Sequence, residues 1–171
     1  GSEAKIWWGK HNKPYEPAQF DGLLRRLQAY LQGRTVFVQD AYSGADPEFR
    51  IRVRVVTETA WHNVFVRNMF IREFDQAVLD AWQADFTVLH CPNFHAIPEL
   101  DHTNSEAFVL VDFDRKTVII GGTSYAGEIK KSIFTVMNYL LPQKGVMSMH
   151  CSANQGSDAD DVALFFGLSG T

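Results

Sequence analysis

The stretch TVIIGGTSYAGEIKK, residues 117–131, decides how this chain is expected to fold. Its β-branched start is typical of a strand, and from Ile129 onward apolar side chains recur at the spacing of a buried helical stripe. The paired glycines Gly121 and Gly122 separate these two patterns. A strand that passes through a glycine turn into a helix brings backbone N–H groups together where an anion can bind. The stretch therefore predicts a strand–turn–helix unit of an α/β fold, with a candidate site at the turn.

Lys130 and Lys131 fall in about the first turn of the predicted helix. The positive end of the helix macrodipole repels cations at this position. Either an anion offsets the two charges, or one amine gives up its proton, because a like charge or a metal ion lowers the pKa of an amine. Taken alone, the local pattern favours two solvated surface lysines. Tyr125 is either a packing residue with a solvated hydroxyl group or a contact to a substrate carboxylate.

A second group of candidate residues lies near the end of the sequence. Residues 146–149 predict a strand that ends at His150, and the carboxyl ends of strands in α/β folds often face a ligand. A lone histidine more often has a structural role, and Cys151 is more typical of a small buried group than of a nucleophile. Residues 161–166 predict a short buried strand that leads directly into residues 167–171.

The residues after this strand match the beginning of the phosphate loop GxxxxGK[ST]. In that loop backbone amides surround the phosphate oxygens, a lysine binds the terminal phosphates and a hydroxyl group holds a divalent ion. Only the first five positions are present, and they are a weak signal by themselves. These positions are Gly167, Leu168, Ser169, Gly170 and Thr171.

Further elements extend outward from the central stretch. Residues 107–111 and 117–120 predict a hairpin, and a helix is expected from Pro17 to Leu31. Arg50, Arg52 and Arg54 alternate with Ile51, Val53 and Val55 along another predicted strand. This pattern indicates either a solvated, ion-paired sheet face, which we favour, or a surface that faces an anion. The helical spacing of Trp61, Val64, Phe65 and Met69 predicts a core-facing helix.

Composition limits the classes of protein to which the chain can belong. Of 171 residues, 46% are hydrophobic and 21% are charged, which excludes a disordered tail. The net charge of −4 disfavours general nucleic-acid binding, and the longest apolar runs are too short to cross a membrane. Cys91 and Cys151 show no paired spacing, which favours a reducing, cytoplasmic compartment.

Taken together, the longer motifs resemble the ATP-dependent phosphoenolpyruvate carboxykinase family. They occur in the family's order and span most of the chain. The stretches that carry the resemblance are GGTSYAGEIKK (121–131), MHCSAN (149–154) and FFGLSGT (165–171), with shorter matches at 67–72, 104–106 and 138–142.

The resemblance implies an α/β enzyme with a mixed sheet and flanking helices. Residues 1–145 would form the later part of its N-terminal substrate-side domain, and residues 146–171 would begin its P-loop nucleotide-binding domain. The implied reaction is that of oxaloacetate with ATP, giving phosphoenolpyruvate, carbon dioxide and ADP in gluconeogenesis. The implied cofactors are Mn²⁺ and the Mg²⁺ that accompanies ATP.

The same resemblance assigns roles to individual residues. Lys131 and His150 would bind Mn²⁺ and thereby reach both substrate and ATP, with the lysine amine uncharged. Tyr125 would contact the substrate carboxyl group, and Lys130 would add positive potential near the transferred phosphoryl group. Residues 167–171 would begin the ATP phosphate loop.

One departure is Ser124, which stands where many members of the family carry tryptophan. A substrate-binding arginine is expected before Gly1, and the phosphate-loop lysine and a metal-binding aspartate are expected after Thr171. We therefore expect the chain by itself to be inactive. Two other interpretations stay open: another P-loop kinase or NTPase, and a non-catalytic binding module.

Overall fold

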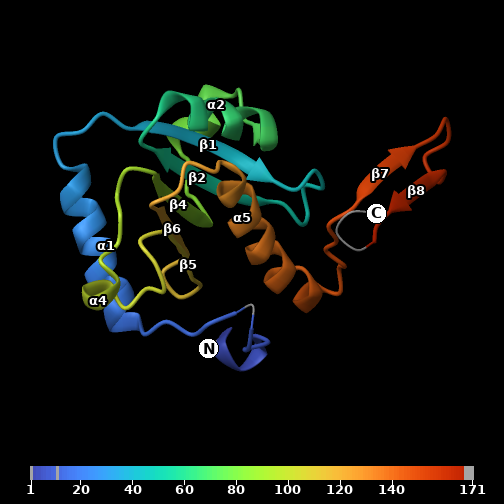
Figure 1. Ribbon diagram of the computed structural model, residues 1–171. Coiled ribbons are helices and arrows are strands. Elements are labelled where there is room, and N and C mark those ends of the chain that lie inside the picture. The colour runs from blue at the N-terminus through green and yellow to red at the C-terminus, as the bar shows by residue number, and fades with distance from the viewer. Residues whose placement is uncertain (1, 11, 168–171) are drawn as a thin grey trace. The chain divides into compact units, whose positions relative to one another are not determined.

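The computed structural model describes residues 2–10 and 12–167. The chain divides into two compact units, residues 1–136 and 137–171, and the division falls within the helix α5 (Figure 1). The elements of the first unit are η1 (Ser2–Lys5), α1 (Pro17–Leu31), β1 (Phe37–Ser43), β2 (Ile51–Thr57), α2 (Ala60–Met69), β3 (Ile71–Arg72), α3 (Gln76–Asp80), β4 (Phe86–Cys91), α4 (Pro98–Asp101), β5 (Phe108–Asp112), β6 (Thr117–Gly121) and most of α5 (Gly127–Leu140).

The first unit is built on a six-stranded mixed sheet with the strand order β3-β1-β2-β4-β6-β5. The three central strands β2, β4 and β6 are parallel, and β1, β3 and β5 join them in antiparallel pairs. The predicted hairpin is confirmed as β5 and β6, in which Phe108 pairs with Gly121. The expected α/β fold with a mixed sheet and flanking helices is confirmed.

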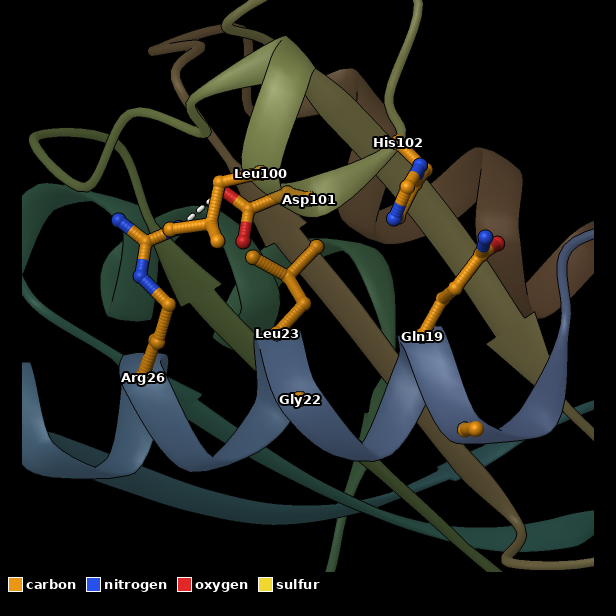
Figure 2. A pocket seen from close by; sticks show the side chains of 8 residues that line it. Gln19, Gly22, Leu23, Arg26, Leu100, Asp101 and His102 are labelled. Carbon is orange, nitrogen blue, oxygen red and sulfur yellow. Dashed lines mark hydrogen bonds and ion pairs between the residues drawn. The ribbon is translucent and has the colours of Figure 1, made fainter.

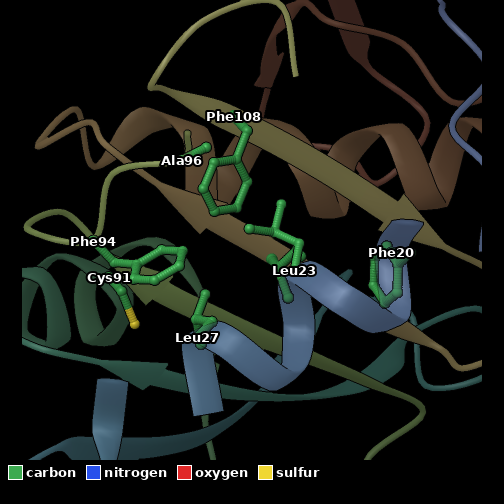
Figure 3. Close-up of a cluster of buried hydrophobic side chains, with 8 residues drawn as sticks. Phe20, Leu23, Leu27, Cys91, Phe94, Ala96 and Phe108 are labelled. Carbon is green, nitrogen blue, oxygen red and sulfur yellow. The ribbon is translucent and has the colours of Figure 1, made fainter. Parts of the chain in front are cut away.

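Helix α1 covers one face of the sheet with an apolar stripe. Pro17 occupies its first turn, where a missing N–H costs nothing, and the predicted helix is confirmed. Figure 3 shows the stripe packed against side chains from the sheet and the loop after β4. This buried cluster comprises Phe20, Leu23, Leu27, Cys91, Phe94, Ala96, Phe108 and Ile119.

Helices α2 and α5 cover the opposite face, so that the sheet lies between two helical layers (Figures 1 and 3). His90 of β4 pairs in register with Ile120, and it therefore faces away from Ile119 and α1. Its imidazole ring contacts His62 of α2, with the ring centroids 4.3 Å apart. The stripe of α5 that includes Ile129 and Ile133 is fully buried.

The core-facing side of α2 differs from the prediction. The expected core residues Trp61, Val64 and Met69 are exposed, whereas His62 and Val66 are buried. Helix α2 packs on β1 and β2. His62 and Val66 are four residues apart and therefore share the helix face that makes this contact. Spacing of apolar residues alone therefore selected the wrong side of this helix.

The arginines of β2 confirm the ion-paired interpretation. Arg54 binds Asp40 of the neighbouring strand through two 2.8 Å hydrogen bonds. Arg52 binds Asp85 at 3.0 Å, while Val53 and Val55 on the other side of the strand are fully buried. The charges of Arg52 and Arg54 are thus neutralised on the sheet surface, whereas Arg50 lies over the Tyr42 ring, 3.7 Å from its centroid.

The second unit contains the end of α5, η2 (Pro142–Lys144), β7 (Ser152–Gln155) and β8 (Val162–Phe165). The strand predicted at 146–149 is wrong, because the strand that pairs with β8 begins only at Ser152. β8 itself is confirmed as a strand, but Phe165 is 61% exposed and not buried as expected. A two-stranded sheet provides no opposite layer to cover its apolar side chains.

Candidate functional site

The candidate site begins at the carboxyl edge of the three parallel strands. The ends of β2, β4 and β6 lie next to one another there, since Thr57 pairs with His90 and Cys91 pairs with Gly121. Ligands of open α/β sheets characteristically bind outside this edge. The loop that follows β6, residues 122–126, leads from this edge into α5.

The glycines at the start of this loop meet a steric requirement. Gly122 has a φ of +69°, in the left-handed region, and a Cβ atom there would lie 2.5 Å from the carbonyl oxygen of Glu106. At Gly121 a Cβ atom would lie 2.6 Å from the ring of Phe108. Only glycine permits the loop to pass this close to the neighbouring backbone. The paired glycines Gly121 and Gly122 therefore fix the path of the loop.

The rest of the loop closes onto the start of the helix. The N–H of Tyr125 donates to Oγ1 of Thr123 at 3.2 Å, and the N–H of Glu128 donates to the carbonyl oxygen of Tyr125 at 3.1 Å. The Tyr125 ring lies against Gly127, where a Cβ atom would come within 2.5 Å of it. Tyr125 is nevertheless 65% exposed, so its side chain is accessible to a ligand.

Lys130 and Lys131 lie in the first turn of α5, as predicted. Lys130 is half-buried and Lys131 is exposed. Among the described residues neither amine has a carboxylate within ion-pair distance. The structure thus brings Tyr125 and both lysines to one loop and helix start, where Glu128 also lies but forms no ion pair with either lysine in the described part of the chain.

Two buried histidines beneath the loop were not identified from the sequence. His62 donates from Nε2 to the carbonyl oxygen of Ser124 at 3.0 Å, and His90 donates in the same way to Thr123 at 3.0 Å. Burial lowers the pKa of both imidazoles, that of His90 to about 4, with the adjacent His62 as a further cause. The signal for His90 was its position at the end of a parallel strand, which is where functional side chains gather.

The remaining candidates belong to the second unit. His150 and Cys151 are exposed just before β7, so the expectation that Cys151 is buried is wrong. Gly167 is exposed, and Leu168–Thr171 lie outside the described residues. No group of three or more His, Cys, Asp or Glu side chains gathers in the described part of the chain as a metal cluster would. The pairing of Lys131 with His150, which joins residues of different units, stays a prediction.

A pocket of about 270 Å³ between α1 and α4 contains none of these candidates (Figure 2). Arg26 and Asp101 form an ion pair at its edge, and Asp101 also accepts a 2.7 Å hydrogen bond from the N–H of Ile97. The buried carboxylate is therefore already satisfied by the protein. The pocket is lined by Ala18, Gln19, Gly22, Leu23, Arg26, Leu100, Asp101 and His102.

Among the described residues, none of the helices combines the length and the apolar character needed to span a membrane.

Comparison with known proteins identifies the class to which this α/β chain belongs. A family model described as phosphoenolpyruvate carboxykinase matches residues 1–171. The chain is 61% identical to the phosphoenolpyruvate carboxykinase (ATP) of Geobacter sp. (strain M21) over 99% of its own length and 32% of that protein. It is 60% identical to the phosphoenolpyruvate carboxykinase (ATP) 2 of Moorella thermoacetica, over 97% of this chain and 31% of that protein.

The chain therefore belongs to the phosphoenolpyruvate carboxykinase family. The relatives that it matches carry the ATP-dependent name, which confirms the resemblance read from the motifs. It is also 55% identical to the enzyme of that name from Thermus thermophilus. The chain spans about a third of the length of these relatives.

Proposed function

We propose that the full-length protein containing this chain is an ATP-dependent phosphoenolpyruvate carboxykinase. It would convert oxaloacetate and ATP into phosphoenolpyruvate, carbon dioxide and ADP, in the cytoplasm and in gluconeogenesis. The observation that carries the proposal is the loop of residues 121–131. This stretch matches the family, and it folds as a strand–turn–helix unit whose exposed tyrosine and two lysines lie at the carboxyl edge of the sheet.

The first step of the reaction needs a group that binds the dicarboxylic substrate. The exposed Tyr125 hydroxyl is assigned to a carboxyl group of oxaloacetate, to which it would donate a hydrogen bond. Loss of carbon dioxide leaves an enolate, and its oxygen then attacks the γ-phosphoryl group of ATP. Because negative charge accumulates between the two reactants, Lys130 is assigned to that region as a positive charge that forms no ion pair with the described residues.

The metal sites are assigned from the chemistry of the donor set. Lys131 and His150 would hold Mn²⁺ with two nitrogen atoms, which suits a borderline metal, and Mg²⁺ would accompany ATP. Both side chains are exposed, and the Lys131 amine is not neutralised by a carboxylate of the described residues, so it can serve as a ligand once deprotonated. A bound divalent ion supplies charge stabilisation for the enolate and phosphoryl oxygens.

The nucleotide is assigned to the end of the chain. Residues 167–171 would begin the phosphate loop, and a domain boundary at 145/146 would separate this nucleotide side from the substrate side. Since the phosphate-loop lysine and further ligands are expected outside the sequence, we infer that the chain alone binds ATP weakly and is inactive.

The test is Mn²⁺-dependent release of carbon dioxide from oxaloacetate and ATP by the full-length protein. Lys131→Ala and His150→Ala are each expected to lower turnover by about 100-fold or more and to weaken Mn²⁺ affinity, measured separately by electron paramagnetic resonance. Lys144→Ala, which removes an exposed lysine elsewhere, is the matched control. Unchanged Mn²⁺ affinity in both variants would refute the ligand assignment. ATP hydrolysis that does not depend on oxaloacetate would indicate a different P-loop enzyme.

A further inference from the structure

His62 and His90 form a buried pair directly beneath the loop that carries Tyr125. They come from different elements, α2 and β4, and are 1% and 0% exposed. Their rings meet edge to face at an angle of 78°. Burying two imidazoles side by side is costly unless their polar atoms bind specific partners.

Their partners are two consecutive carbonyl groups of the loop. Nε2 of His90 lies 3.0 Å from the Thr123 oxygen, and Nε2 of His62 lies 3.0 Å from the Ser124 oxygen. A carbonyl oxygen only accepts, so each ring must carry its proton on Nε2. Nδ1 of His62 then accepts from the hydroxyl group of Thr59. Nδ1 of His90 is buried and has no partner among the described residues.

Burial favours the neutral form of both rings, and a proton on Nδ1 of His90 would have no acceptor among the described residues. Protonation of either ring would place a charge in the core, next to a second imidazole at 4.3 Å. The depressed pKa of both rings, caused first by burial, agrees with the geometry. The nearby carboxylate of Glu58 acts in the opposite direction and raises the pKa of His90, against the lowering by burial and by His62.

Two hydrogen bonds to adjacent carbonyl groups restrain the orientation of the loop backbone more than a single hydrogen bond would. Adjacent carbonyl groups define the two peptide planes on either side of Ser124, and the second of these planes ends at the nitrogen of Tyr125. The direction of an exposed side chain depends on its backbone, because few neighbours restrain it. The histidines therefore restrain the backbone from which the Tyr125 side chain extends.

We propose that His62 and His90 are positioning residues that use two neutral imidazole N–H groups to hold the Thr123–Ser124 backbone, and thereby aim Tyr125 at a substrate carboxylate. The inference rests on the proposed function for the identity of that substrate. The hydrogen bonds themselves do not depend on it.

The kinetic test compares leucine and glutamine variants of the full-length protein. His90→Leu and His62→Leu remove the donor and are expected to raise KM for oxaloacetate about tenfold, with KM for ATP unchanged. His90→Gln and His62→Gln place an amide N–H near the position of Nε2 and should restore KM to within about threefold. His102→Leu, which removes an exposed histidine in the α1–α4 pocket, should leave KM unchanged.

A purely structural role would lower the yield of folded protein and leave KM of the folded fraction unaltered, and that result would overturn the inference. If the leucine variants do not fold, the comparison of KM between the glutamine variants and the wild type tests the inference.

¹⁵N NMR of the wild-type histidines at pH 7 should show the Nε2–H tautomer at both positions, independently of activity. An Nδ1–H tautomer or a charged ring at either position would overturn the inference. Correct tautomers without carboxykinase activity would refute the proposed function and, with it, the assigned role of Tyr125.

Discussion

At the scale of single residues, Gly122 shows how sterics fix the loop. Its left-handed φ and the nearby Glu106 carbonyl leave no space for a side chain. We expect Gly122→Ala to lower the free energy of unfolding by about 2 kcal/mol or more, since strain and a backbone clash add. Denaturant titration of the full-length protein measures the change.

Gly33→Ala is the matched control for this prediction. Gly33 has a similar φ of +73°, but no atom lies within 4 Å of a Cβ added there. It therefore reports the conformational cost alone, roughly 1 kcal/mol. Equal losses in the two variants would show that close packing against residues 106–107 is unimportant.

The neutral state of His90 has a consequence for stability against pH. Its pKa in the folded protein is about 4, mainly because of burial, while an unfolded chain titrates near 6.5. Between these values the unfolded state binds more protons, so stability is full above about pH 6.5 and falls as the pH drops toward 4. The free energy of unfolding lost over this pH range is at most about 3 kcal/mol. His90→Gln should flatten this part of the pH profile of the melting temperature; an unchanged profile would contradict the prediction.

At the scale of elements, α1 is held by its buried stripe. Leu27 is 0% exposed and packs in the cluster with Cys91 and Phe94. Leu27→Ala should destabilise the protein by about 2–5 kcal/mol, because it removes apolar contacts and leaves a cavity. Gln28→Ala, on the exposed side of the same helix, should change stability by less than about 0.5 kcal/mol. Thermal unfolding of both variants tests this, and similar shifts in the two would contradict it.

The elements also show which parts of the fold could be predicted. The hairpin of β5 and β6 and the helices α1 and α5 are encoded in nearby residues, by turns and by apolar periodicity, and all were predicted. The strand expected at 146–149 was wrong, because pairing with β8, several residues away, decides where β7 begins. The pattern of neighbouring residues does not specify with which strand a segment pairs.

The candidate site likewise contains residues that could be predicted from the sequence and residues that could not. The loop that carries Tyr125 and the two lysines is one continuous motif, and the sequence was sufficient to find it. His62 and His90 act on carbonyl groups 62 and 33 residues away, so only the folded chain reveals them. The proposed metal pair, Lys131 and His150, is closer in the sequence, but its two residues belong to different units.

At the scale of the whole molecule, the acidic chain neutralises some of its positive charges in ion pairs and leaves others, among them Lys130 and Lys131, without one in the described part of the chain. It carries 16 Lys and Arg residues against 20 Asp and Glu residues. Arg52 and Arg54 are neutralised by Asp85 and Asp40 on the sheet surface. Lys130 and Lys131 lack such partners in the described part of the chain, so positive potential is left where the proposed anionic substrates bind.

The two thiols differ in burial, so one of them can be labelled selectively. Burial, with Glu58 nearby, raises the pKa of Cys91 to about 12, whereas Cys151 is exposed. Since only a thiolate is nucleophilic, a maleimide dye at neutral pH should alkylate Cys151 and spare Cys91, which peptide mass spectrometry would verify. Comparable alkylation of Cys91 in the native protein would contradict this. The attached fluorophore would sit one residue from His150, so paramagnetic Mn²⁺ bound at the proposed site should quench its emission.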